Sequence, residues 1–159
     1  MNPRKFRFTA MFIVCLFLFV PEPAAAETVF HVPGDYAKIW QAIEALPAEG
    51  GTILVGPGTY RGNVITYKSV TLQSINGRQD TIIDAEESAR VITFTGLKDN
   101  PAKLIGFTLI NGRAEDENGG GIQVQNSTNV TIKNCTIKQN IADNGSGGGL
   151  YVDADSKVT

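Results

Sequence analysis

The sequence predicts an all-β protein, a right-handed parallel β-helix with a short N-terminal capping α-helix and about four coils. Two observations predict this fold. Residues 102–131 and 130–159 match at a constant offset of 28 residues without gaps. Inside each copy, short runs of alternating apolar residues are separated by Gly, Asn or Asp rather than by helical segments. Such a repeat buries its apolar side chains only when successive copies stack on one another.

Residues 1–26 have the layout of a secretory signal peptide. Three basic residues lie within the first seven positions, residues 11–20 are all apolar, and residues 24–26 are Ala-Ala-Ala. A run of ten apolar residues is too short to span a bilayer, which needs about 20. We therefore expect cleavage before Glu27 and no transmembrane helix in the remaining chain.

Charge and composition argue against nucleic-acid binding. The formal net charge is −2, and the three basic residues of the signal segment are lost on cleavage. No basic stripe, which phosphate neutralisation requires, is visible in what remains. A mildly acidic, exported chain is expected to be secreted, periplasmic or on the outer surface.

Residues 27–50 are predicted to form an N-terminal cap that contains a helix at residues 35–46. Asp35 is a suitable helix N-cap residue, and Pro47 ends the segment. The apolar residues fall at helical spacing and are expected to share one buried face: Tyr36, Ile39, Trp40, Ile43 and Leu46. The alternative for Trp40 is a platform on which a sugar ring stacks.

Residues 51–159 are predicted to form the coils of the β-helix. Apolar residues alternate at Val130 and Ile132 and then resume at Cys135 and Ile137, and this change of phase requires a corner at Asn134. The equivalent position in the other copy is Gly106; Gly and Asn are the residues that most readily adopt positive φ. Stacking then places one copy directly over the next, with these expected pairs: Phe107 over Cys135, Leu109 over Ile137, and Ile122 over Leu150. Four side chains are expected to point outward: Thr108, Gln123, Thr136 and Tyr151.

Earlier β-rich runs, at 52–55, 70–72, 81–83 and 91–94, are expected to form less regular coils. The sequence stops at Val158-Thr159, where a further copy begins. We expect a truncated solenoid with no C-terminal cap, which has the potential to self-associate through its uncovered end.

Several segments resemble a known family. Residues 32–36 (Val-Pro-Gly-Asp-Tyr) and 57–60 (Pro-Gly-Thr-Tyr) are similar to the N-terminal signature of right-handed β-helix proteins of the pectin lyase-like superfamily. Residues 106–109, 119–122 and 134–137 resemble the parallel β-helix repeats of its bacterial members. The resemblance implies a β-helix that acts on or binds polysaccharide. The motifs of the family's methylesterases, lyases and hydrolases have no match here.

The densest acidic group is a candidate calcium site. Glu115, Asp116 and Glu117 are consecutive, and the 28-residue offset places Glu115 beside Asp143. Stacked carboxylates repel unless a cation or a proton lies between them, and Ca²⁺ takes six to eight oxygen ligands. The alternative is a solvated acidic loop. No other cofactor is indicated.

Three weaker candidates remain. Asp84, Glu86 and Glu87 follow a predicted strand and are either a pair of catalytic carboxylates or a polar turn. Cys135 stands alone after signal cleavage and is expected to be a small core residue rather than a nucleophile. Four asparagines begin Asn-X-Ser/Thr sequences, which are expected to be incidental if the source is bacterial: Asn126, Asn129, Asn134 and Asn144.

Together these features predict an exported, surface or adhesin-like β-helix protein that binds extracellular polysaccharide or cell-surface glycan and has no catalytic set of its own. The alternative is the N-terminal part of a polysaccharide-active enzyme of the pectate lyase, pectin esterase or uronan epimerase type. The catalytic and substrate-binding residues are not identified by the sequence.

Overall fold

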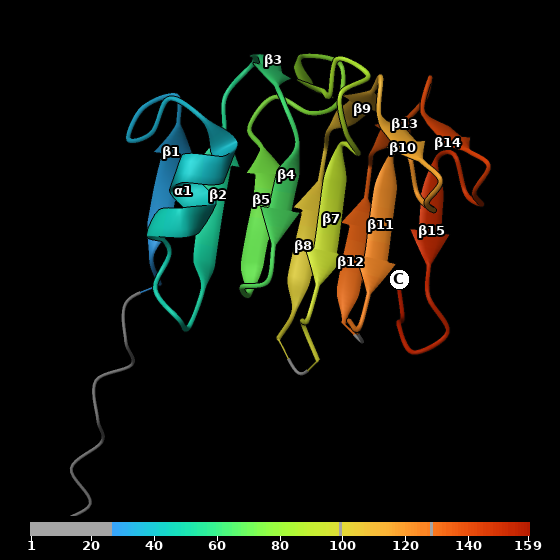
Figure 1. The fold of residues 1–159 in the computed structure, drawn as a ribbon. Helices are drawn as coiled ribbons and strands as arrows, with labels where there is room; N and C mark the ends of the chain where they lie inside the picture. Colours follow the sequence, from blue (N-terminus) through green and yellow to red (C-terminus); the bar gives the residue numbers. More distant parts are fainter. Residues whose placement is uncertain (1–26, 99, 128) are drawn as a thin grey trace, which may run out of the picture.

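In the computed structural model the chain winds into a parallel β-helix (Figure 1). The structure describes residues 27–98, 100–127 and 129–159; the predicted signal peptide at 1–26 lies outside the described residues. Every strand pair within the described part of the chain is parallel. Each coil therefore runs alongside the previous coil in the same direction. The predicted β-helix solenoid is confirmed.

Four coils follow strand β1 (Val29–Val32) and helix α1 (Ile39–Ala45). Coil 1 holds β2 (Gly51–Val55), β3 (Gly58–Arg61) and β4 (Val64–Thr66). Coil 2 holds β5 (Val70–Ser74), β6 (Thr81–Asp84) and β7 (Ile92–Thr95). Coil 3 holds β8 (Ala102–Ile105), β9 (Thr108–Ile110), β10 (Arg113–Glu115) and β11 (Ile122–Gln125). Coil 4 holds β12 (Val130–Lys133), β13 (Thr136–Ile137), β14 (Ile141–Asp143) and β15 (Leu150–Val152).

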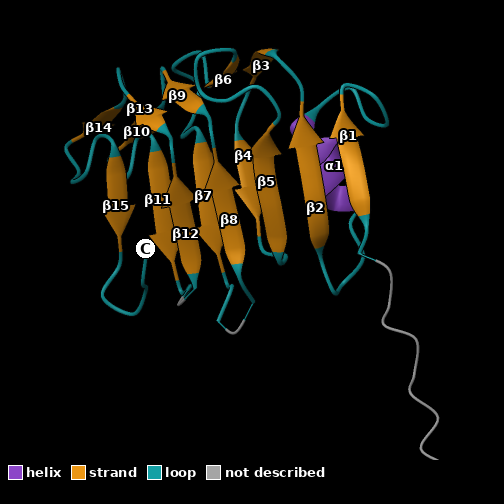
Figure 2. Cartoon of the chain, turned by 180° about the vertical axis from the view of Figure 1, so that it is seen from behind, coloured by secondary structure: helices purple, strands orange, loops and turns teal. Residues whose placement is uncertain are grey.

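Stacking of these coils generates four sheets along the solenoid. Sheet A has the order β1-β2-β5-β8-β12, and sheet B the order β3-β6-β9-β13. Sheet C has the order β4-β7-β11-β15, and sheet D is the pair β10-β14. Sheets A and C are the two long walls: sheet C faces the viewer in Figure 1 and sheet A faces the viewer in Figure 2.

The predicted 28-residue register is observed between coils 3 and 4. Leu109 pairs with Ile137, and Ile122 pairs with Leu150. Thr136 donates its amide to the Phe107 carbonyl at 2.8 Å, which places Cys135 in register with Phe107 as expected. Like side chains therefore form continuous columns through the interior.

Alternation along the strands separates a buried interior from two solvated walls. In β11, Ile122 and Val124 are fully buried, whereas Gln123 and Gln125 are partly exposed. Each large apolar side chain buried in this way contributes about 1.5–3 kcal/mol to folding. Thr108 is an exception to the predicted outward set. It is only 8% exposed, because its hydroxyl donates to the Arg78 carbonyl at 2.7 Å under the loop that leads to β6.

Left-handed residues at the corners recur from coil to coil. Gly106 and Asn134 have φ of 79° and 53°, as the change of apolar phase predicts. Gly96 and Asn126, with φ of 70° and 51°, form an equivalent pair at the end of β7 and β11. Repeating the same turn keeps successive coils superimposable, so that strand pairing continues beyond each corner.

The predicted helix is shorter than expected, and its buried face was assigned wrongly at Tyr36 and Trp40. Tyr36 precedes the helix and is only partly buried. Helix α1 begins at Ile39 rather than at residue 35, because the Asp35 carboxylate accepts a hydrogen bond from the His31 amide at 2.7 Å and closes a local turn instead. Counting from Ile39, positions i+3, i+4 and i+7 face the core. The helix segment thus buries these residues: Ile39, Ala42, Ile43 and Leu46. Trp40 lies outside this buried face, and its side chain is 42% exposed.

Candidate functional site

The predicted acidic cluster contains an arginine that the sequence analysis did not place there. Glu115 and Asp143 are paired on neighbouring strands of sheet D, as the offset predicts. Arg113 lies between their coils: its Nε is 2.6 Å from Asp143 Oδ2 and 3.8 Å from Glu115 Oε1. The hydrogen bond with Asp143 and the negative charge of that carboxylate raise the pKa of the Arg113 guanidinium. The cation that stacked carboxylates require is therefore supplied by the chain itself.

The other two predicted calcium ligands also have protein partners. Glu117 forms an ion pair with Arg90, and Asp116 accepts a hydrogen bond from the side chain of Asn144 at 3.0 Å. Among residues 27–98, 100–127 and 129–159, no group of three or more His, Cys, Asp or Glu side chains is arranged to hold a metal ion. The calcium site stays a prediction, and the observed geometry favours ion pairs at these positions.

Asp84, Glu86 and Glu87 form a tight polar turn after β6. Asp84 accepts hydrogen bonds from the Glu86 amide at 2.9 Å and from the Asn111 side chain at 3.0 Å. Glu86 and Glu87 both have positive φ, of 54° and 55°. Their carboxylates form exposed ion pairs that cross to other strands: Glu86 with Arg61 at 3.3 Å and Glu87 with Arg113 at 4.0 Å.

Cys135 is a partly buried thiol beneath the corner at Asn134. Its Sγ lies 3.3 Å from the Lys133 carbonyl oxygen, and burial raises the pKa of the thiol. A raised pKa keeps the sulfur protonated at neutral pH, which disfavours nucleophilic attack. This geometry agrees with the interpretation of Cys135 as a core residue.

The exposed Trp40 borders a pocket of about 330 Å³, which we call the Trp40 pocket. Helix α1 supplies one wall, and the turn from β3 to β4 supplies the other. The Lys38 ammonium lies 6.0 Å from the centre of the Trp40 ring, at the outer limit of a cation–π contact. Polar and aromatic side chains complete the lining: Thr59, Tyr60, Arg61 and Asn63. Burial raises the pKa of the Tyr60 hydroxyl, which donates to the Gly56 carbonyl at 3.1 Å, so Tyr60 is held as a neutral wall of the pocket.

A second concavity, the polar groove, runs over the outer face of sheet C and has a volume of about 560 Å³. In register across the sheet, Ile65 pairs with Thr93 and Thr93 pairs with Gln123. Gln125 donates its side-chain amide to the Thr95 hydroxyl at 3.2 Å. Arg90 and residues 116–118 form the side of the groove, so the predicted acidic loop is its wall. Helix α1 contacts β4, the first strand of sheet C, which places the Trp40 pocket next to this strand.

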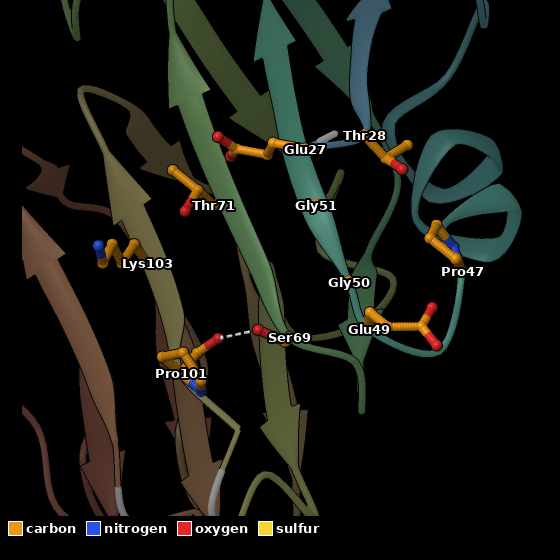
Figure 3. A pocket seen from close by; sticks show the side chains of 10 residues that line it. All are labelled: Glu27, Thr28, Pro47, Glu49, Gly50, Gly51, Ser69, Thr71, Pro101 and Lys103. Carbon is orange, nitrogen blue, oxygen red and sulfur yellow. Dashed lines mark hydrogen bonds between the residues drawn. The ribbon is translucent and has the colours of Figure 1, made fainter. Parts of the chain in front are cut away.

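A third concavity, of about 590 Å³, lies on the outer face of sheet A near the N-terminal cap (Figure 3). Thr71 and Lys103 stand side by side on β5 and β8, and the Ser69 hydroxyl donates to the Pro101 carbonyl at 3.0 Å. Glu27 and Glu49 line its other side. None of its lining residues is aromatic, so it offers less binding chemistry than the smaller Trp40 pocket despite its size.

The Trp40 pocket was not identified from the sequence as a site. Its residues come from two segments, 37–40 and 59–64, that only the winding of coil 1 brings together. The available signal was the helical spacing: a buried face made of Ile39, Ala42, Ile43 and Leu46 leaves Trp40 outside it.

These features define the class of protein: a parallel β-helix with a polar outer wall and an exposed aromatic pocket at one end.

The chain is 33% identical over 136 residues to a cell surface glycoprotein of Methanothermus fervidus, a match that covers 85% of this chain. The chain spans about a fifth (21%) of the length of that relative. No family model matches the sequence, so membership of the pectin lyase-like superfamily remains a hypothesis. The similarity fits a surface-associated or secreted protein, and no helix in the described part of the chain is long and apolar enough to cross a membrane.

Proposed function

We propose that the chain is an exported β-helix protein that binds extracellular or cell-surface polysaccharide without altering it chemically. The observation that carries this proposal is the exposed Trp40 ring beside a pocket lined by hydroxyl, amide and cationic groups. A large exposed aromatic residue on a concave surface is a typical anchor for a ligand.

The chemistry of the pocket suits a sugar ring. Aromatic side chains present a flat apolar surface, against which the C–H face of a pyranose packs. Asn63 and Thr59 supply hydrogen-bonding groups for hydroxyls at the ring edge. Lys38 and Arg61 favour a sugar that carries a carboxylate, since a guanidinium fork matches carboxylate geometry. Arg61 forms an exposed ion pair with Glu86, and exposed ion pairs are weak enough to exchange partners.

Binding is favoured over cleavage because the acidic residues are engaged elsewhere. Hydrolysis of a glycosidic bond commonly requires two carboxylates that flank the bond, one of them as a proton donor. Here Asp84 accepts one hydrogen bond from within its own turn and one from Asn111 in the next coil, while Glu86 and Glu87 are paired with arginines. The polar groove on sheet C presents threonine and glutamine side chains, which suit multiple weak hydrogen bonds along a polymer.

Location on the cell surface rests on two supports. The layout of residues 1–26 favours export, and the similar protein from Methanothermus fervidus is named a cell surface glycoprotein. We therefore propose a secreted or outer-surface location together with a glycan partner.

Affinity electrophoresis in native gels tests the proposal, with gels that contain a neutral glucan, polygalacturonate or alginate. We expect at least one polymer to retard the protein, with a stronger effect for the acidic polymers. Trp40→Ala should weaken this retardation about tenfold, which corresponds to 1.4 kcal/mol. Tyr67→Ala is the matched control, since Tyr67 is 62% exposed but lines neither the Trp40 pocket nor the polar groove. Absence of retardation with every polymer, or equal loss in both variants, would overturn the proposal.

A further inference from the structure

The asparagines of coils 3 and 4 divide into two groups by sequence. Four of them begin Asn-X-Ser/Thr sequences, all within residues 126–146: Asn126, Asn129, Asn134 and Asn144. Three others in the same coils lack the hydroxyl residue at the third position: Asn111, Asn118 and Asn140. The Asn-X-Ser/Thr sequence is the acceptor motif for N-linked glycans in exported proteins.

The group without the motif is used to hold the coils together. Asn111 donates to Asp84 in the preceding coil at 3.0 Å. Asn118 accepts from the Ser146 amide at 2.7 Å, and Asn140 accepts from the Gly112 amide at 2.7 Å. All three asparagines are partly buried, so their amides are committed to structure.

The group with the motif is exposed at all four positions. Within the described part of the chain, no hydrogen bond uses the side-chain amide of Asn126, Asn129 or Asn134, whereas Asn144 donates to Asp116 at 3.0 Å. Asn126 and Asn134 occupy left-handed corner positions directly after β11 and β12, and Asn144 also has a positive φ. Their amide nitrogens are therefore free to react, while that of Asn144 is held.

The preceding coil leaves room beside both corner asparagines. Asn134 stacks on Gly106, and Asn126 stacks on Gly96, so the residue in register with each of them in the preceding coil has no side chain. A Cβ built at Gly96 meets no atom within 4 Å, whereas a Cβ at Gly106 would lie 3.4 Å from the Gly77 Cα and the Ser74 Cβ. Asn134 instead borders an open hollow of about 460 Å³. Neither asparagine lines the polar groove or the concavity on sheet A, so a bulky group attached at these corners would leave both of them accessible.

We propose that Asn126 and Asn134 carry N-linked glycans, with Asn129 as a weaker acceptor and Asn144 disfavoured. The side-chain amide nitrogen forms a bond to the anomeric carbon of an oligosaccharide carried on a polyprenyl phosphate or diphosphate. The bond from that carbon to the phosphate oxygen breaks, the phosphate leaves with the electron pair, and one amide proton passes to a base of the transferring enzyme. The proposal depends on export of the chain but not on glycan binding at the Trp40 pocket.

Mass spectrometry of the full protein, purified from the organism that makes it, tests the assignment. We expect a mass above that of the unmodified chain and glycopeptides that contain Asn126 and Asn134. Asn126→Gln and Asn134→Gln should each remove one glycan mass. Asn63→Gln is the control, because Asn63 is exposed but has no hydroxyl residue two positions later.

A second pair of variants removes any ambiguity from misfolding at the corner. Thr136→Val destroys the motif and leaves Asn134 in place, whereas Thr136→Ser retains the motif. Loss of the Asn134 glycan in the first variant and its persistence in the second is the expected result. An exported protein with no added mass, or one modified at Asn144 while Asn126 and Asn134 remain bare, would overturn the proposal.

Discussion

Substitution of Gly121 by Ala tests how closely coils 3 and 4 approach. A Cβ at Gly121 would lie 2.4 Å from the Gly149 carbonyl oxygen and 2.9 Å from Asn140 Nδ2, both closer than a Cβ tolerates. Two hydrogen bonds of 2.8 Å cross the coils here, from the Gly121 amide to Gly148 and from the Ile122 amide to Gly149. Weakening them costs about 1 kcal/mol each, and overpacking costs about 1–3 kcal/mol. We expect Gly121→Ala to lower the free energy of unfolding by about 3–5 kcal/mol.

Gly149 is the matched control, because it occupies the equivalent position one coil later. The nearest atom to a Cβ at Gly149 is Ile137 Cγ2 at 3.5 Å, an ordinary contact. Gly149→Ala in the chain of residues 27–159 should therefore be neutral or stabilise by about 0.4–1 kcal/mol, since alanine restricts the unfolded chain. Urea unfolding followed by circular dichroism gives both values. Equal destabilisation by the two substitutions would refute the proposed stacking of the coils at this point.

Four further outcomes are expected. Arg113→Met should destabilise the fold, and more at low salt, because it leaves Glu115 beside Asp143 without a cation; Arg61→Met is the control, and an equal effect in urea unfolding would argue against a role for Arg113 between the coils. Calcium should not raise the melting temperature, because the acidic side chains already have protein partners; a rise that EDTA reverses would support the calcium hypothesis. Cys135 should react slowly with a maleimide at pH 8 in the folded protein and quickly in urea. Since the pKa of the folded thiol is raised, the free energy of unfolding should also fall as the pH passes about 8.5, and Cys135→Ser should abolish that fall.

The repeat predicts coils 3 and 4 well because their loops have equal length. The offset of 28 residues alone places Leu109 on Ile137 and Glu115 on Asp143, as observed. Coils 1 and 2 were less predictable because their corners differ in length. Coil 2, for example, leaves sheet A through the loop at residues 75–80, whereas Ile105 and Thr108 are separated by two residues. Strand pairing tolerates such insertions, since only the strands must superimpose.

The site residues depended on contacts that the sequence does not display. The 28-residue offset predicts the strand pairing of sheet D, but it does not show that the Arg113 side chain reaches diagonally across to Asp143. Asp35 was expected to cap the helix, but a carboxylate near a Pro-Gly turn bonds its own local backbone more readily. That choice moved the start of the helix to Ile39. Trp40 faces outward for another reason: the small Ala42, rather than Trp40, shares the buried face with Ile39 and Ile43.

The stacking of coil 4 on coil 3 is tested most directly by scalar couplings across hydrogen bonds in the NMR spectrum of residues 27–159. Couplings from the Thr136 nitrogen to the Phe107 carbonyl carbon, and from the Ile122 nitrogen to the Gly149 carbonyl carbon, are predicted by the two 2.8 Å bonds. Their absence, with couplings that pair these strands in an antiparallel sense or in another register, would contradict the β-helix.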